Sequence, residues 1–126
     1  MKALLDTSVV LATNVAPLEG ELAISAATVA ELHYGVLVTN DPAIRSERLR
    51  RLTVLLRTFD PLPLDGAVAA SYGQLAAAMV AKGRNPRARV VDLLIAATAH
   101  AHGATLFTKN AEDLVGVEDL VEVVAI

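Results

Sequence analysis

Four acidic residues stand where folding could bring their carboxylates together: Asp6, Glu31, Asp92 and Asp113. Carboxylate oxygens suit Mg²⁺ or Mn²⁺, which proteins hold through a few such ligands and retained waters. The chain has no cysteine, so a metal would be held by oxygen or histidine ligands. Together the four acids predict a divalent-cation site that acts on phosphate groups.

Asp92 has the most unusual surroundings of the four. It lies in the largely apolar run Val90–Ala99, and at 3.6 residues per turn it shares a helix face with Ile95. We therefore expect its carboxylate to be carried toward the interior, where an unpaired charge is costly. A basic side chain could compensate it, and so could a cation held between several acids. The residues around Asp92 leave both explanations open.

The other three acids each have an ordinary explanation as well. Asp6 follows an apolar run of strand length, and ligands of open α/β sheets bind at such strand ends. Glu31 by itself fits an exposed helix acid. Asp113 lies three residues after Asn110, a spacing that fits a capping box as well as it fits a ligand.

Hydrophobic periodicity, caps and turn residues predict strands that alternate with helices. We expect strands at 2–5, 22–24, 105–107 and 121–125, a short edge strand within 59–64, and helices at about 9–14, 27–38, 42–58, 66–82, 90–102 and 110–114. Such alternation indicates an α/β fold with a parallel sheet. The carboxyl edge of that sheet would gather the four acids.

Length and composition limit the function classes. With 126 residues, 54% of them hydrophobic, residues 1–126 are expected to form a single domain with a sizeable core. No uninterrupted apolar run approaches the roughly 18 residues of a membrane span. Asp6 interrupts the apolar start too early for a signal peptide. We therefore expect a cytoplasmic protein without membrane association.

Basic residues gather in two clusters although the net charge is −3. The first contains Arg45, Arg48, Arg50, Arg51 and Arg57, and the second contains Lys82, Arg84, Arg87 and Arg89. Either cluster alone fits a solvated surface. The negative net charge argues against coating of nucleic acid by bulk electrostatics. The aromatic content of 3% argues against base stacking as the main mode of binding.

Four segments together resemble the PIN-domain nucleases, and among them the VapC-type ribonuclease toxins of bacterial toxin–antitoxin modules. They are Leu4-Leu5-Asp6-Thr7-Ser8-Val9, Ile24-Ser25-x-x-Thr28-Val29-Ala30-Glu31-Leu32-x-x-Gly35, Asp92-Leu93-Leu94-Ile95-Ala96-Ala97-Thr98-Ala99 and Leu106-x-Thr108-x-Asn110-x-x-Asp113. They follow the family's order over nearly the whole chain. The chain departs from the pattern in a short link before Glu31, in Leu114 where an aromatic residue often follows the last acid, and in Ser8 where asparagine is frequent.

The resemblance implies a three-layer α/β/α sandwich with a central parallel sheet, and an endoribonuclease that hydrolyses RNA phosphodiester bonds. It implies that Mg²⁺ or Mn²⁺ is held by Asp6, Glu31, Asp92 and Asp113, with Ser8, Thr108 and Asn110 as supporting polar residues. Arg87, Arg89 and Lys109 lie near these acids in sequence, and we expect them to bind the RNA backbone.

The resemblance also implies two protein partners. One is a second copy of the chain in a homodimer. The other is a cognate antitoxin whose basic or apolar segment covers the acidic site. We expect the alanine-rich helix, especially Ala67–Ala81, to offer the apolar surface for association.

Three alternatives belong to other function classes. A phosphoacceptor receiver domain is also a single α/β unit, with Asp60 as the acceptor and Thr108-Lys109 as the switch pair, but the chain lacks the adjacent acidic pair of such domains. A phosphatase built on Asp6-x-Ser8 lacks its second aspartate. A PIN fold without catalytic activity would serve as a binding module.

Overall fold

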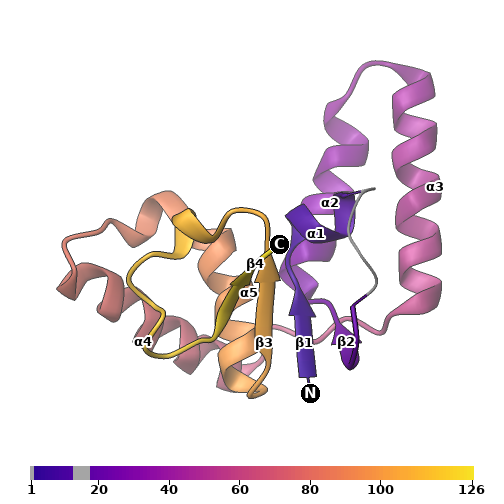
Figure 1. Cartoon of the computed structure of the whole chain (residues 1–126). Helices are drawn as coiled ribbons and strands as arrows, with labels where there is room; N and C mark the ends of the chain where they lie inside the picture. Colours follow the sequence, from indigo (N-terminus) through magenta and orange to yellow (C-terminus); the bar gives the residue numbers. More distant parts are fainter. Residues whose placement is uncertain (1, 13–17) are drawn as a thin grey trace.

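A parallel sheet forms the centre of the structure, a computed structural model that describes residues 2–12 and 18–126. Within those residues the sheet has four strands in the order β2-β1-β3-β4, all parallel. They are β1 (Lys2–Leu5), β2 (Glu21–Ala23), β3 (Thr105–Thr108) and β4 (Val123–Ala125). The predicted parallel α/β architecture is confirmed, and the carboxyl ends of the strands lie along one edge (Figure 1).

Both faces of the sheet are buried, which makes the fold three-layered. Leu4 pairs with Ala23 on one side and with Leu106 on the other. Because side chains alternate along a strand, Leu4 and Leu106 enter one core cluster while Leu5 and Phe107 enter a second. Helices cover both clusters, as the α/β/α prediction requires.

The helices divide between the two sides of the sheet. They are α1 (Thr7–Leu11), α2 (Ala26–Val38), α3 (Pro42–Thr58), α4 (Gly66–Ala81) and α5 (Val90–Ala101), with the 3₁₀ turns η1 (Pro86–Arg89) and η2 (Ala111–Leu114). Helices α4 and α5 pack together beside β3, and α2 and α3 form a hairpin that projects beyond the sheet (Figure 1). The hairpin carries the first basic cluster on α3.

Three of the helices begin after a capping side chain. Ser25 caps α2 by accepting a hydrogen bond from the Thr28 N–H at 3.1 Å. Asp41, followed by Pro42, caps α3, and Asp65 caps α4. Each cap satisfies backbone donors that the first turn leaves free.

Three local predictions are corrected. The helix expected at 9–14 begins at Thr7, because the Asp6 carboxylate caps it. Its expected end lies in residues 13–17, outside the described residues. Segment 59–64 forms a single bridge, between Leu62 and Ser25, because its two prolines cannot donate to a ladder. The last strand is shorter than expected, at Val123–Ala125.

The alanine-rich helix keeps apolar side chains on its surface, including Ala67, Ala77 and Val80. Helix α4 buries Val68, Leu75 and Met79, because it packs closely against α5. The hairpin also has large exposed apolar side chains, among them Tyr34 at 69% exposure and Leu37 at 72%. Among the described residues, no helix combines the length and apolar character needed to span a membrane.

Candidate active site

Asp6 is held in place by hydrogen bonds to both of its carboxylate oxygens. Its Oδ1 accepts from the Ser8 N–H at 2.9 Å, from the Val9 N–H at 3.3 Å and from the Ser8 hydroxyl. Its Oδ2 accepts from the Thr108 hydroxyl. With 8% exposure, the carboxylate is buried just beyond β1, and these donors replace the water that burial removes.

Ser8 and Thr108 also join the two central strands at this edge. The Ser8 hydroxyl oxygen accepts from the Lys109 N–H at 3.0 Å, and the Thr108 hydroxyl oxygen accepts from the Asn110 N–H at 3.0 Å. The structure therefore brings Ser8 and Thr108 to Asp6 as supporting residues. Asn110 contributes its backbone N–H, and its side chain makes no capping bond to η2.

Glu31 enters the site from α2 through a contact that the sequence analysis missed. The Thr7 hydroxyl donates to Glu31 Oε1 at 2.5 Å, and the Thr7 and Thr28 hydroxyl oxygens lie 3.1 Å apart. Thr28 is fully buried. The signal for part of this contact was present, because Thr28 and Glu31 are three residues apart and share a helix face.

Asp113 pairs with Arg89, a residue of the second basic cluster. Arg89 Nη2 lies 3.1 Å from Asp113 Oδ1, and both side chains are partly exposed. The capping box suggested by the spacing of Asn110 and Asp113 does not form, since η2 has no side-chain cap. The carboxylate is therefore directed to Arg89 and the acidic edge.

Asp92 is under electrostatic stress. Burial raises the pKa of its carboxyl above the ordinary value, and repulsion from Asp113 and Glu31, then from Asp6, adds to the rise. The positive charge of Arg89 lowers the pKa and offsets part of this. Its helix face alone predicted a position toward the interior. Asp92 is half-buried at the start of α5, close enough to the other three acids for their charges to act on it. All four acids share one electrostatic environment.

The donor chemistry of this environment fits a divalent cation, but the side chains would have to move to bind one. Among residues 2–12 and 18–126, no three histidine, aspartate or glutamate side chains are arranged to hold an ion as they stand. Four like charges repel one another, which favours this separation. A cation between them would remove the repulsion that raises the pKa of Asp92.

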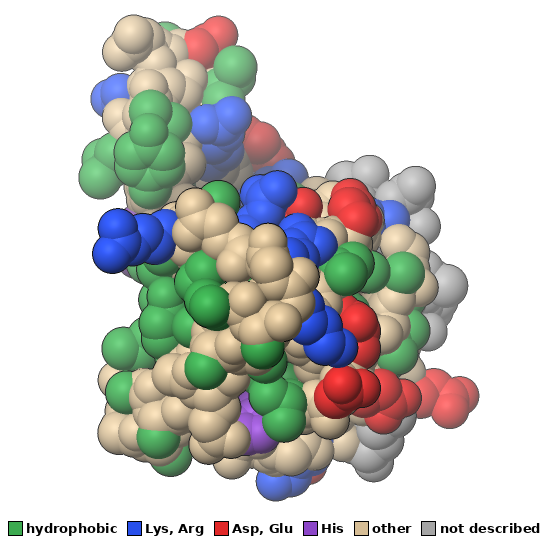
Figure 2. Space-filling model, turned by 90° about the vertical axis from the view of Figure 1, so that its left-hand side faces the viewer, with side chains coloured by type: hydrophobic (Ala, Val, Ile, Leu, Met, Phe, Trp, Pro, Cys, Tyr) green, Lys and Arg blue, Asp and Glu red, His purple; other side chains and the backbone are tan. Residues whose placement is uncertain are grey.

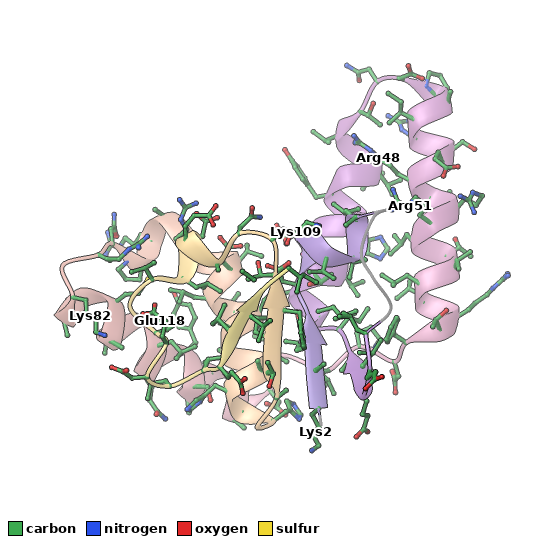
Figure 3. The ribbon with its side chains drawn as sticks, viewed as in Figure 1. Lys2, Arg48, Arg51, Lys82, Lys109 and Glu118 are labelled. Carbon is green, nitrogen blue, oxygen red and sulfur yellow. The ribbon has the colours of Figure 1, made fainter. Side chains whose placement is uncertain are left out.

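The second basic cluster is divided by the fold. On the side of the molecule drawn in Figure 2, basic side chains lie beside acidic ones. Arg87 is exposed on η1, and Lys109 lies at the carboxyl edge of the sheet (Figure 3). Lys82 lies at the far end of α4 (Figure 3) and pairs with Asp119 at 3.3 Å. Arg89 is thus the residue of this cluster that reaches an acid of the site.

Comparison with known proteins decides between a nuclease and a receiver domain. The family model described as "PIN domain" matches residues 3–117. The chain belongs to the PIN-domain family.

Relatives place this PIN domain among the VapC ribonucleases. Ribonuclease VapC8 of Mycobacterium tuberculosis is 41% identical over 100 residues, covering 76% of this chain and 88% of that protein. Ribonuclease VapC4 of the same species is 35% identical, covering 99% and 97%.

Solved structures share the PIN-domain architecture over the whole length. VapBC-5 from Mycobacterium tuberculosis, a member of the VapBC family of toxin–antitoxin systems, has a TM-score of 0.86 at 30% identity and covers 99% of this chain and 98% of that one. FitAcB from Neisseria gonorrhoeae has a TM-score of 0.77 at 28% identity, with coverage of 96% and 95%. These matches argue against the receiver-domain and phosphatase hypotheses.

Proposed function

We propose that this PIN domain cleaves RNA phosphodiester bonds with Mg²⁺ or Mn²⁺ bound by Asp6, Glu31, Asp92 and Asp113. The observation that supports this most is the convergence of the four acids at one edge of the sheet, where the other three repel the charge of Asp92. Such a cluster carries an excess of negative charge that a divalent cation would neutralise. The membership in the VapC ribonucleases gives the substrate class.

The four acids would divide the work. Asp6 and Asp92 would position the cation, while Glu31 and Asp113 would complete its ligands or orient the attacking water. When bound, the cation would stabilise charge on the phosphate and lower the pKa of a bound water. Ser8 and Thr108 hold the Asp6 carboxylate, and Thr7 holds that of Glu31.

Basic residues on the rim would hold the RNA backbone close to the four acids. We assign this role to Arg87, Arg89 and Lys109, whose charges offset the repulsion between phosphates and carboxylates. Arg89 already contacts Asp113. It would therefore exchange part of that contact for a phosphate when RNA binds.

Partner binding is proposed from surface chemistry together with the relatives. VapBC-5 is a toxin–antitoxin system, and by analogy we propose a cognate antitoxin and a homodimer for this chain. An apolar groove of about 560 Å³ borders Glu31 and is lined by Tyr34, Leu64 and Val91. An apolar segment of an antitoxin placed there would cover the acidic edge. We also propose a single domain for residues 1–126 and a cytoplasmic location.

Incubation of the purified protein with total RNA tests the proposal. We expect cleavage with Mn²⁺ and none with EDTA, with activity restored when Mn²⁺ is added in excess. Cleavage that persists in EDTA would contradict the metal role. RNA that stays intact under every condition, with a folded protein, would favour the inactive binding module.

A further inference from the structure

A second groove begins at the acidic edge and runs between α2 and α3. Its volume is about 660 Å³, and Thr7 and Glu31 line one end. Along its length it is lined by α3 side chains, including Arg48 and Arg51. The groove is therefore continuous with the proposed catalytic centre, on the opposite side of Glu31 from the apolar groove.

Two arginines are held in position at this groove. Arg48 Nη1 donates to the Gly35 carbonyl at 2.7 Å, and Arg51 Nη2 donates to the Leu11 carbonyl at 3.1 Å. Both lie between α2 and α3 in Figure 3. A guanidinium has five N–H donors, so one carbonyl bond fixes the side chain and leaves donors for a ligand. Little side-chain entropy then has to be lost on binding.

The charge of the lining favours an anionic occupant. The lining includes three arginines and a single acid, Glu31. Arg50 is paired with Glu47 at 2.7 Å on the exposed side of α3, which leaves Arg48 and Arg51 as the main cationic groups. The lining also includes Leu52 and Leu55, apolar side chains against which sugars and bases can pack.

We propose that this groove holds the RNA strand that flanks the scissile phosphate, with Arg48 and Arg51 bound to its phosphates. The inference rests on the proposed ribonuclease function and adds a second basic surface to the rim residues Arg87, Arg89 and Lys109. A strand held on both sides of the four acids is fixed in register against them, which phosphate contacts achieve without reading sequence.

Binding without cleavage isolates this role. The affinity of the protein for a fluorescent single-stranded RNA is measured by anisotropy in EDTA at several salt concentrations. Arg48→Gln and Arg51→Gln remove the charge but keep a donor for the carbonyl. Arg57→Gln is the matched control, because Arg57 is exposed on the same helix outside the groove lining. Circular dichroism confirms that each variant is folded.

We expect each groove variant to bind RNA about 3 to 10 times more weakly and to lower the salt slope by roughly 0.7, the value for one phosphate contact on a single strand. The Arg57→Gln control should change affinity by less than about twofold. Groove variants that match the control would overturn the inference, even while the parent protein cleaves RNA with Mn²⁺. Loss of a copurifying protein partner with unchanged RNA affinity would overturn it as well, and would assign the groove to protein binding.

A parent protein that cleaves no RNA under any condition tests the proposed function separately. If that protein still binds RNA through Arg48 and Arg51, the groove inference stands and the catalytic proposal fails. If it neither binds nor cleaves RNA, both fail.

Discussion

Asp6 and Asp92 stand at the same edge of the sheet, but their surroundings differ in kind. Asp6 is buried, and hydrogen bonds from backbone N–H groups and two hydroxyls reach both of its oxygens. Asp92 is half-buried, and the forces that raise its pKa are burial and repulsion from other acids. One carboxylate is fixed by its neighbours, and the other is stressed by them.

This difference indicates a division between stability and function. The bonds to Asp6 connect β1, α1 and the end of β3, so they support the fold at the place where the site is built. The burial and repulsion at Asp92 lower the stability of the fold at neutral pH, and binding of a cation or a proton relieves them. Substitutions among the residues that hold Asp6 should therefore mainly lower stability, whereas substitution of Asp92 should mainly lower RNA cleavage.

The largest expected effect is on catalysis at the stressed side. Asp92→Asn keeps the side-chain volume and loses the charge that would hold the cation, so RNA cleavage should fall by about 100-fold or more. The circular dichroism spectrum should not change. Full activity in the folded variant would contradict the proposed difference between Asp92 and Asp6, because Asp92 would then have no role in binding the metal.

The next largest effect is on stability at the fixed side. Thr108→Val is nearly isosteric and removes the hydroxyl that donates to Asp6 Oδ2. Because the carboxylate stays buried, we expect the free energy of unfolding to fall by about 1 to 3 kcal/mol. Denaturant titration at neutral pH measures it, and Thr53→Val, at an exposed position on α3, is the control. Equal effects from both variants would show that Asp6 is not held as described.

The smallest expected effect is the contribution of Asp92 to the pH dependence of the free energy of unfolding. A carboxyl with a raised pKa binds its proton more tightly in the folded state, so stability falls as pH rises from the unfolded pKa through the folded one. In EDTA, Asp92→Asn should therefore melt above the parent at neutral pH. Because solvent screens a half-buried group, we expect a gain on the order of 0.5 kcal/mol. The gain should vanish in acid below the unfolded pKa.

Asp113→Asn provides the matched comparison for this melt. It also removes one negative charge from the cluster, but it breaks the contact with Arg89. The two changes oppose each other, so its gain should be smaller than that of Asp92→Asn. An equal gain from both variants would show that Arg89 does not compensate Asp113.

The amino-acid sequence by itself determined the order of the elements and the residues that could meet. The alternation of apolar runs, the caps at Asp41 and Asp65, and the proline after Asp41 are local signals, and the structure confirms the helices they predicted. Strand ends in a parallel sheet share an edge, so Asp6 and Asp113 could be placed together before any contact was known.

The tertiary structure alone decided which partner each site residue has. Thr7 contacts Glu31 across 24 positions, and Thr108 contacts Asp6 across 102. Asp113 is paired with Arg89 and is not part of a capping box. Local spacing cannot distinguish these outcomes, because a side chain that can cap a helix can equally bond to a distant group. The choice depends on which neighbours packing brings within about 3 Å.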